Sequence, residues 1–288
     1  MDLQGKVAVV AGATRGAGRA IAVTLGEVGA TVYCTGRSVR GQSSDLGRTE
    51  TIEETAEMVT QAGGLGIAVQ VDHTEEEQVR ALFARIEAEQ DGRLDILIND
   101  VWGGDMLTEW PLKFWEASLE KGRLLLERAV WSHILTSRYG VPLMVNRGAG
   151  IVIEVTDGEN YQYRGNLFYS LAKTAGVHLA VGMAADFASR GLPITAVAVT
   201  PGFLRSEAML DLFGVTEENW REGAAKDPHF IASETPYYVA RAIRALICDP
   251  DVGRFAGQTL SSWGLSEVYD FVDLDGRRPH WGRYFRTI

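Results

Sequence analysis

The sequence has few cysteines and no long hydrophobic run. Its 288 residues include only two cysteines, Cys34 and Cys248, which excludes a disulfide framework and fits a reducing compartment. No apolar run reaches the roughly 18 residues that a membrane span requires, and the first residues lack a signal-peptide pattern. We therefore expect a cytoplasmic protein that does not associate with a membrane.

Basic residues and metal ligands are also scarce. Lysine and arginine total 28 against 38 aspartates and glutamates, giving a formal net charge of −10. This balance argues against nucleic-acid binding, because phosphate contacts depend on basic side chains. The five histidines are scattered, so we expect no metal site. No serine stands in a G-x-S-x-G turn, so a hydrolase is not supported.

Short β-branched runs alternate with helical segments from end to end. The near-continuous apolar strands predict an α/β fold with a single doubly wound parallel sheet, a Rossmann fold, and helices on both faces. Residues 1–288 are expected to form one domain. Within it, 202–230 would be an insertion that either closes over the substrate as a lid or packs against the body. Strands are expected at 6–10, 31–35, 67–71, 94–98, 151–155 and 193–199, and long helices at 114–139 and 168–189.

A glycine-rich turn follows the first expected strand. Gly12, Gly16 and Gly18 have the spacing G-x3-G-x-G between a strand and a helix, and Thr14 and Arg15 lie inside the turn. Glycines let the backbone approach a pyrophosphate, and the free N–H groups at a helix start bind it. The turn therefore predicts a dinucleotide site.

The end of the second expected strand favours NADP(H) over NAD. Dinucleotide enzymes that use NAD carry an acidic residue there, which holds the ribose 2′-hydroxyl. This chain has Gly36 and Arg37 instead. Arg15 and Arg37 would bind the additional 2′-phosphate through charge-assisted hydrogen bonds.

Tyr169 and Lys173 stand four residues apart on the second long helix, and so share one face of it. A nearby ammonium group is expected to lower the pKa of the phenol, which suits proton transfer near neutral pH. Thr156 follows the fifth expected strand, and its hydroxyl could bind the same substrate oxygen. These three residues are the candidate catalytic group.

With these motifs the chain resembles a classical short-chain dehydrogenase/reductase (SDR), in the dehydrogenase/reductase member-1-like branch. The branch shares the stretches found here at 99–104, 155–158 and 168–173. The resemblance implies hydride transfer between a nicotinamide and a carbonyl or secondary alcohol, and a homodimer or homotetramer. It further implies roles for the residues that match family positions. Tyr169 would be the acid/base, Lys173 would hold the nicotinamide ribose, and Thr156 would replace a serine. Asp72 would lie by the adenine, and Asn99 would lie at the edge of the sheet where ligands bind. Pro201 and Gly202 would form a wall of the nicotinamide site, and Ser206 would lie near the carboxamide of the nicotinamide.

One departure from the family bears on activity. The asparagine that anchors a proton-relay water in the family falls at Ala129, so Ser132 or His133 would have to replace it, or activity would be weak. We predict an NADP(H)-dependent carbonyl reductase (ketoreductase) for a bulky apolar or aromatic small molecule. The alternative is a catalytically weak NADP-binding sensor. An isomerase or dehydratase is disfavoured by the glycine spacing.

Overall fold

A single seven-stranded sheet organises the chain, and all its strand pairs are parallel. The computed structural model describes residues 2–42 and 47–287. The strand order is β3-β2-β1-β4-β5-β6-β7, so β2 and β3 extend the sheet on one side of β1 and the later strands extend it on the other. The strands are β1 Val7–Ala11, β2 Thr31–Gly36, β3 Leu65–Gln70, β4 Ile96–Asn99, β5 Gly150–Val155, β6 Ile194–Thr200 and β7 Thr259–Ser261. The predicted doubly wound Rossmann fold is confirmed.

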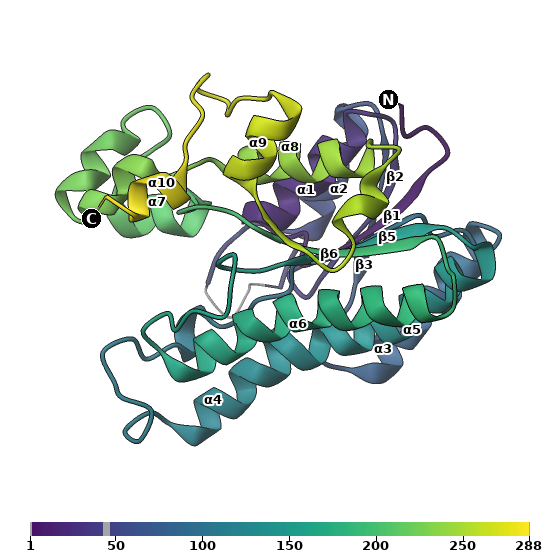
Figure 1. Ribbon diagram of the computed structural model, residues 1–288, viewed down its shortest axis with the longest axis horizontal. Helices are drawn as coiled ribbons and strands as arrows, with labels where there is room; N and C mark the ends of the chain where they lie inside the picture. Colours follow the sequence, from purple (N-terminus) through teal and green to yellow (C-terminus); the bar gives the residue numbers. More distant parts are fainter. Residues whose placement is uncertain (1, 43–46, 288) are drawn as a thin grey trace.

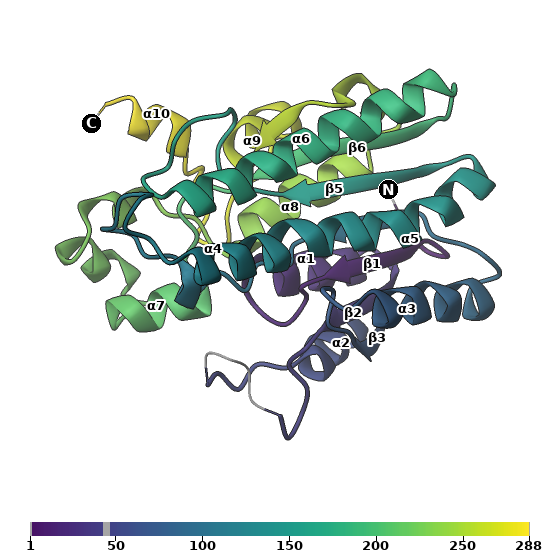
Figure 2. The same cartoon turned by 90° about the horizontal axis from the view of Figure 1, so that it is seen from below.

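Helices cover both faces of the sheet. One layer contains α1 (Gly16–Gly26), α2 (Ile52–Gln61), α8 (Pro236–Ile247) and α9 (Ser262–Tyr269) (Figure 1). The other contains α3 (Glu76–Glu89), α4 (Leu119–Leu126), α5 (Ser132–Arg147) and α6 (Leu167–Ser189); Figure 2 shows α4 and α5 running end to end between α3 and α6. Strand β1 serves both layers, because Ala8 and Val10 face the first core while Val7 and Val9 face the second.

The first long helix differs from its expected course. It begins at Leu119, where the Ser118 hydroxyl accepts the Lys121 backbone N–H, rather than at residue 114. A π-helical turn over Glu127–Trp131 separates α4 from α5. The helix then continues past Pro142 to Arg147. A proline removes only one helical donor, and this helix tolerates the loss.

The insertion after β6 packs mainly on itself and on the end of the chain. It contains α7 (Glu207–Phe213) and two short 3-10 turns, and it lies beside α10 (Trp281–Phe285) in Figure 1. The Phe203 ring contacts Phe230 and Trp281, with centroid separations of 5.3 and 5.8 Å. The aromatic residues of the insertion therefore form a small core with the C-terminal helix α10. The sequence did not indicate this contact between the insertion and the end of the chain.

Glu234 is a buried carboxyl group that holds the start of this insertion. Its Oε2 accepts the Gly202 backbone N–H at 2.9 Å and the Ser262 hydroxyl at 2.7 Å. Its Oε1 has no hydrogen-bond partner within the described part of the chain. Burial raises the pKa of Glu234 to about 8, because water no longer stabilises the charged form.

This raised pKa predicts a pH dependence of stability. The folded chain retains the proton of Glu234 over a range where the unfolded chain releases it, so stability should fall between about pH 5 and pH 8. Glu234→Gln keeps a neutral side chain of the same shape and should reduce that fall, by up to about 1.4 kcal/mol per pH unit. Denaturant unfolding at several pH values measures the difference. Glu87→Gln, on the exposed face of α3, is the control, and an equal slope for wild type and Glu234→Gln would contradict the assignment.

Candidate active site

The glycine turn packs against the end of β4 so closely that side chains are excluded. A Cβ on Gly12 would lie 2.5 Å from the Asp100 carbonyl oxygen, and one on Gly18 would lie 2.2 Å from the Gly12 oxygen. Gly12 also has φ +92°, a conformation that favours glycine. The turn is fixed on its other side by the Gly12 and Ala13 N–H groups, which donate to the Thr35 carbonyl at 3.0 Å.

The start of α1 holds a carboxylate. The Gly16 backbone N–H donates to Glu207 Oε2 at 2.9 Å, and the Arg15 side chain makes no cap to this helix. Glu207 is the first residue of α7, and the preceding Ser206 lies beside Gly16. A helix N-terminus favours negative charge. The position therefore fits one phosphate of a dinucleotide, whose charge would replace that of Glu207.

Arg15 lies in the glycine turn after β1, and Arg37 lies in the adjoining loop after β2. A Cβ on Gly36 would lie 2.7 Å from the Thr14 hydroxyl, so the two loops are in contact. Arg37 Nη1 lies 3.7 Å from a carboxylate oxygen of Asp72, the residue expected near the adenine. Arg15 Nη1 lies 4.0 Å from Glu50. The two loops that carry the predicted arginines are therefore in contact, and each arginine has an acidic neighbour.

Tyr169 and Lys173 lie on the first turns of α6. The Asn166 side chain accepts the Tyr169 N–H at 3.1 Å and so starts the helix there. The Tyr169 ring lies between Trp102 and Trp110, at centroid separations of 5.2 and 4.9 Å. Lys173 Nζ lies 4.0 Å from the Trp102 ring centroid, a cation–π contact. Both tryptophans come from the loop after β4, which the sequence analysis did not assign to the substrate site.

The phenol of Tyr169 is in a different electrostatic environment from the one expected. Its hydroxyl donates to Asp157 Oδ2 at 2.8 Å. Burial, and then the charge and hydrogen bond of Asp157, raise the pKa of Tyr169 well above 10. The expectation that Lys173 lowers this pKa is wrong, because the charged groups that act on it most are Asp157, Arg164 and Asp105. Burial lowers the pKa of Lys173 itself.

The polar residues at the ends of β4 and β5 are largely engaged within the protein. The Thr156 hydroxyl donates to the Lys173 carbonyl at 2.7 Å. Asn99 is buried and donates to Glu154 at 2.7 Å. Its neighbour Asp100 lies against Gly18 and accepts its backbone N–H, and burial raises the pKa of this carboxyl group to about 7. Asp100 replaces a family asparagine, which is the signal that could have identified it.

Neither proposed replacement for the missing asparagine reaches Tyr169. Ala129 lies in the π-helical turn. The Ser132 hydroxyl donates to the Arg128 carbonyl at 2.6 Å. His133 is buried, with Nδ1 at 2.6 Å from Glu154 and Nε2 at 2.9 Å from the Val101 carbonyl. Both ring nitrogens are therefore occupied by the scaffold.

The remaining predicted residues line the insertion. Pro201 is buried and follows β6 directly. A Cβ on Gly202 would lie 2.9 Å from both Glu234 Oε2 and Trp281. Ser206 caps α7 by accepting the Met209 N–H. These residues stand between the glycine turn and the C-terminal helix.

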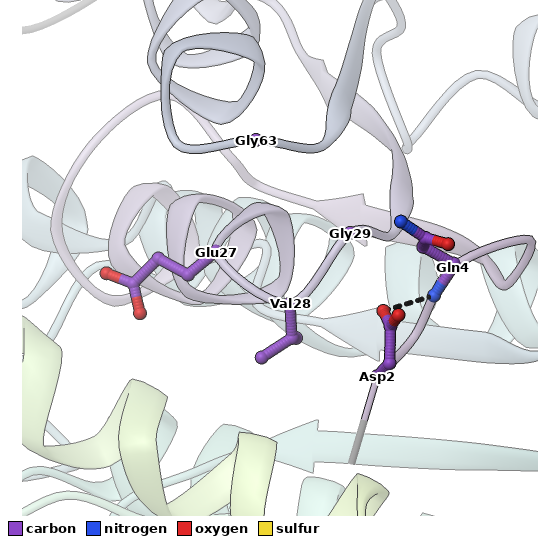
Figure 3. Close-up of a pocket in the computed structure, with 6 residues that line it drawn as sticks. All are labelled: Asp2, Gln4, Glu27, Val28, Gly29 and Gly63. Atoms are coloured by element: carbon purple, nitrogen blue, oxygen red, sulfur yellow. Dashed lines mark hydrogen bonds between the residues drawn. The ribbon is translucent and has the colours of Figure 1, made fainter.

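Two features elsewhere do not add to this site. In residues 2–42 and 47–287 no group of three or more histidine, cysteine or acidic side chains is arranged to hold a metal, and none of the helices has the length and apolar character of a membrane span. Figure 3 shows a hollow at the opposite end of α1 from the glycine turn. Its described lining includes the carboxylates of Asp2 and Glu27 but no basic or nucleophilic side chain.

A parallel doubly wound sheet, a glycine turn that binds an anion and a Tyr169/Lys173 pair define a nucleotide-dependent oxidoreductase. The family model for short chain dehydrogenases matches residues 6–213. The chain is 32% identical over 96% of its length to Dehydrogenase/reductase SDR family member 1 of Mus musculus, and covers 85% of it. The chain therefore belongs to the short-chain dehydrogenase/reductase family, in the branch similar to member 1.

Solved structures agree on the fold. A short chain dehydrogenase of Mycobacterium thermoresistibile superposes with a TM-score of 0.79 at 22% identity, covering 98% of this chain and 93% of that one. A structure from Beutenbergia cavernae with NADP bound at low occupancy gives a TM-score of 0.70 at 24% identity, covering 93% and 98%. The family uses a nicotinamide cofactor, and the anion position on α1 fits its pyrophosphate.

The carboxylate on α1 should compete with the cofactor. Glu207→Gln removes the negative charge and should tighten binding of NADH and NADPH by about two- to fivefold, the size of one charge at a helix end. A fluorescence titration of the full chain measures both affinities. Glu218→Gln, an exposed residue of the same insertion, should leave them unchanged. Weaker binding by Glu207→Gln would show that Glu207 supports the site instead.

Proposed function

We propose that the protein is an NADP(H)-dependent oxidoreductase of the ketoreductase type, which interconverts a carbonyl and a secondary alcohol. The observation that carries this proposal is the placement of Tyr169 and Lys173. They lie one helical turn apart at the carboxyl edge of the sheet. Asp100 packs against the glycine turn and interacts electrostatically with Lys173, so the turn and the catalytic helix share this residue. This arrangement supports Tyr169 as a proton donor beside the cofactor position.

The residues of the site divide the work of carbonyl reduction. The bound nicotinamide supplies the hydride to the carbonyl carbon. Tyr169, whose pKa lies above 10, carries its proton at neutral pH and is the group that would donate it to the carbonyl oxygen. Lys173 would hold the ribose of the cofactor through its ammonium group. Thr156 would orient the carbonyl, for which its hydroxyl must leave the Lys173 carbonyl.

The surroundings of Tyr169 favour a bulky apolar or aromatic substrate. Trp102 and Trp110 flank the phenol, and the same loop carries Met106, which is 71% exposed. Large aromatic faces bind apolar surface and orient it through ring contacts. The insertion 202–230 would close over such a substrate through α7, whose first residue, Glu207, accepts a hydrogen bond from the Gly16 N–H of the glycine turn.

Two arginines at the end of β2 support NADP(H) as the cofactor. Arg37 is 3.7 Å from Asp72 and Arg15 is 4.0 Å from Glu50. A bound 2′-phosphate would replace these carboxylates as the anionic partner of the two arginines. The site offers no acid at Gly36, because a side chain there would clash with Thr14. A protein of this fold from Beutenbergia cavernae has NADP bound at low occupancy, which is compatible with this choice.

Cofactor preference tests this assignment. We expect tighter binding of NADPH than of NADH by about 1.5–3 kcal/mol, the value of hydrogen bonds to a charged group. Arg37→Ala should remove most of that difference by weakening NADPH alone. Fluorescence titrations with both nucleotides measure it. Arg40 is an exposed arginine of the same loop that pairs with Glu57, and Arg40→Ala should keep the preference for NADPH. Equal affinities of the wild type for NADPH and NADH would exclude the assignment of NADP(H) as the cofactor.

Removal of the phenol hydroxyl tests the chemistry. Tyr169→Phe keeps the ring between its two tryptophans but removes the proton donor, so turnover should fall by about 10²–10⁴ with cofactor affinity nearly unchanged. Lys173→Met should lower both turnover and affinity. NADPH consumption across a panel of bulky ketones and quinones measures turnover.

A matched control is available in the loop that precedes α6. Tyr161 is 60% exposed, and Tyr161→Phe should retain wild-type turnover. If Tyr169→Phe and wild type consume NADPH equally across the panel, the catalytic assignment is wrong. The protein would then be a cofactor-binding sensor that retains the family residues.

A further inference from the structure

Asp157 is the group that meets the Tyr169 hydroxyl, and no family role accounts for it. It follows Thr156 directly, in the loop after β5. Its Oδ2 accepts a hydrogen bond from the Tyr169 hydroxyl, with 2.8 Å between the two oxygen atoms. The Asp157 side chain is about one quarter exposed, at 25%. One carboxyl group therefore contacts both the proposed acid and the solvent.

Arg164 fixes the position of this carboxyl group. Its Nη2 donates to Asp157 Oδ1 at 2.6 Å and its Nε donates to Oδ2 at 3.1 Å, a two-point contact. The Arg164 backbone N–H donates to the Ser170 hydroxyl at 2.9 Å, which ties the loop to α6. The loop that carries Asp157 is also held at Gly158, whose N–H donates to Thr200 at 2.8 Å. The Asp157 carboxyl group is thus placed by several bonds and not by Tyr169 alone.

The other groups considered for proton supply are turned away from Tyr169. Ala129 has no polar side chain, the Ser132 hydroxyl bonds to its own helix, and both nitrogens of His133 are occupied. A phenol that gives its proton to a substrate must be reprotonated before the next turnover. Asp157 is the carboxyl group in direct hydrogen-bond contact with that phenol.

We propose that Asp157 carries protons between solvent and Tyr169, as a catalytic residue that acts together with the phenol. This proposal rests on the reductase function above and adds a residue to it. Arg164 is the positioning residue of the pair. The path replaces the water relay that the family asparagine would anchor, and it enters the site from the loop after β5.

The proton balance of one reduction is simple. The reduced nicotinamide would supply the hydride, losing a C–H bond and becoming oxidised as the carbonyl carbon gains one, while the O–H bond of Tyr169 breaks and its proton joins the carbonyl oxygen. The phenolate then takes a proton from the Asp157 carboxylic acid, which has received that proton from water. Asp157 returns to the carboxylate that pairs with Arg164. In the oxidation direction each proton moves the opposite way.

Several charged groups act on this pair. Tyr169 is affected by Asp157 and Arg164 from the loop after β5, and by Asp105 from the loop after β4. The negative charge of Asp157 also acts on the pKa of Lys173 of α6, together with the charges of Asp100 and Asp105. Replacement of Asp157 changes one of these charges and leaves the others in place.

Kinetics of two Asp157 variants test the relay. Asp157→Asn keeps a hydrogen-bond acceptor but cannot carry a proton, so kcat should fall by about 10- to 100-fold with KM and NADPH affinity near wild type. Asp157→Ala leaves room for a small acid, and added formate should restore turnover in proportion to its concentration. Glu159→Gln, an exposed acid of the same loop, is the matched control and should behave as wild type with no response to formate.

A measurement without cofactor tests the contact itself. The near-ultraviolet absorbance of phenolate, recorded during a pH titration and corrected with Tyr169→Phe, reports the ionisation of this one phenol. Asp157→Asn should move that ionisation to lower pH, because a negative neighbour that raises the pKa of Tyr169 is gone. Circular dichroism establishes that each variant is folded.

The outcomes separate the two proposals. Wild-type kcat in Asp157→Asn, or a loss that formate does not restore in Asp157→Ala, would overturn the relay while the wild type remains an active reductase. An unchanged phenol titration in Asp157→Asn would overturn the contact. A wild type that turns over no ketone or quinone, with or without formate, would overturn the reductase function and the relay with it.

Discussion

The close packing of the glycine turn against the end of β4 is the constraint on which the site depends. Gly12 and Gly18 leave no space for a side chain, since a Cβ on either would lie within 2.5 Å of a backbone oxygen. This contact directs the start of α1 toward the insertion, where Gly16 meets Glu207. It also places Asp100 between the turn and the charge of Lys173. The cofactor position and the catalytic helix are therefore coupled through backbone contacts, which few substitutions can alter without moving both.

The parts of the molecule that follow from local pattern could be predicted from the sequence. Apolar β-branched runs such as 7–11 and 194–200 must be buried on both faces, and the glycine turn and the Tyr169/Lys173 spacing have local meaning. The boundaries of the first long helix could not be predicted in the same way. Ser118 competes with the apolar residues before it for the start of the helix, and Pro142 is tolerated because its neighbours keep the chain helical. Such outcomes depend on tertiary packing and not on local preference.

The partners of the polar groups were the least predictable part of the site. Asp157 was visible in the sequence as part of the shared stretch 155–158 but had no assigned role, yet its contact with Tyr169 reverses the expected direction of the phenol pKa. The reason is that Tyr169 and Asp157 are brought together by two different elements, the loop after β5 and the first turn of α6. Glu234 is similar, because its burial depends on Gly202 and Ser262 from separate segments. A single sequence carries no direct signal of such long-range pairs.

Several acidic groups of the site share one physical property: they are paired inside the protein. Glu207 occupies the anion position of α1, Asp72 lies near Arg37, and Asp157 accepts the Tyr169 proton. An unpaired charge or polar group in this partly buried edge would be costly, so the internal partners hold the side chains in place. Cofactor and substrate then bind by exchange, each replacing an internal contact with a similar one. The net binding free energy gained per contact is smaller than the free energy of the new contact, because an internal contact is lost. The positions of the reacting groups, however, are set before binding. An arrangement of this kind favours orientation over tight binding, which is what a proton donor beside a hydride acceptor requires.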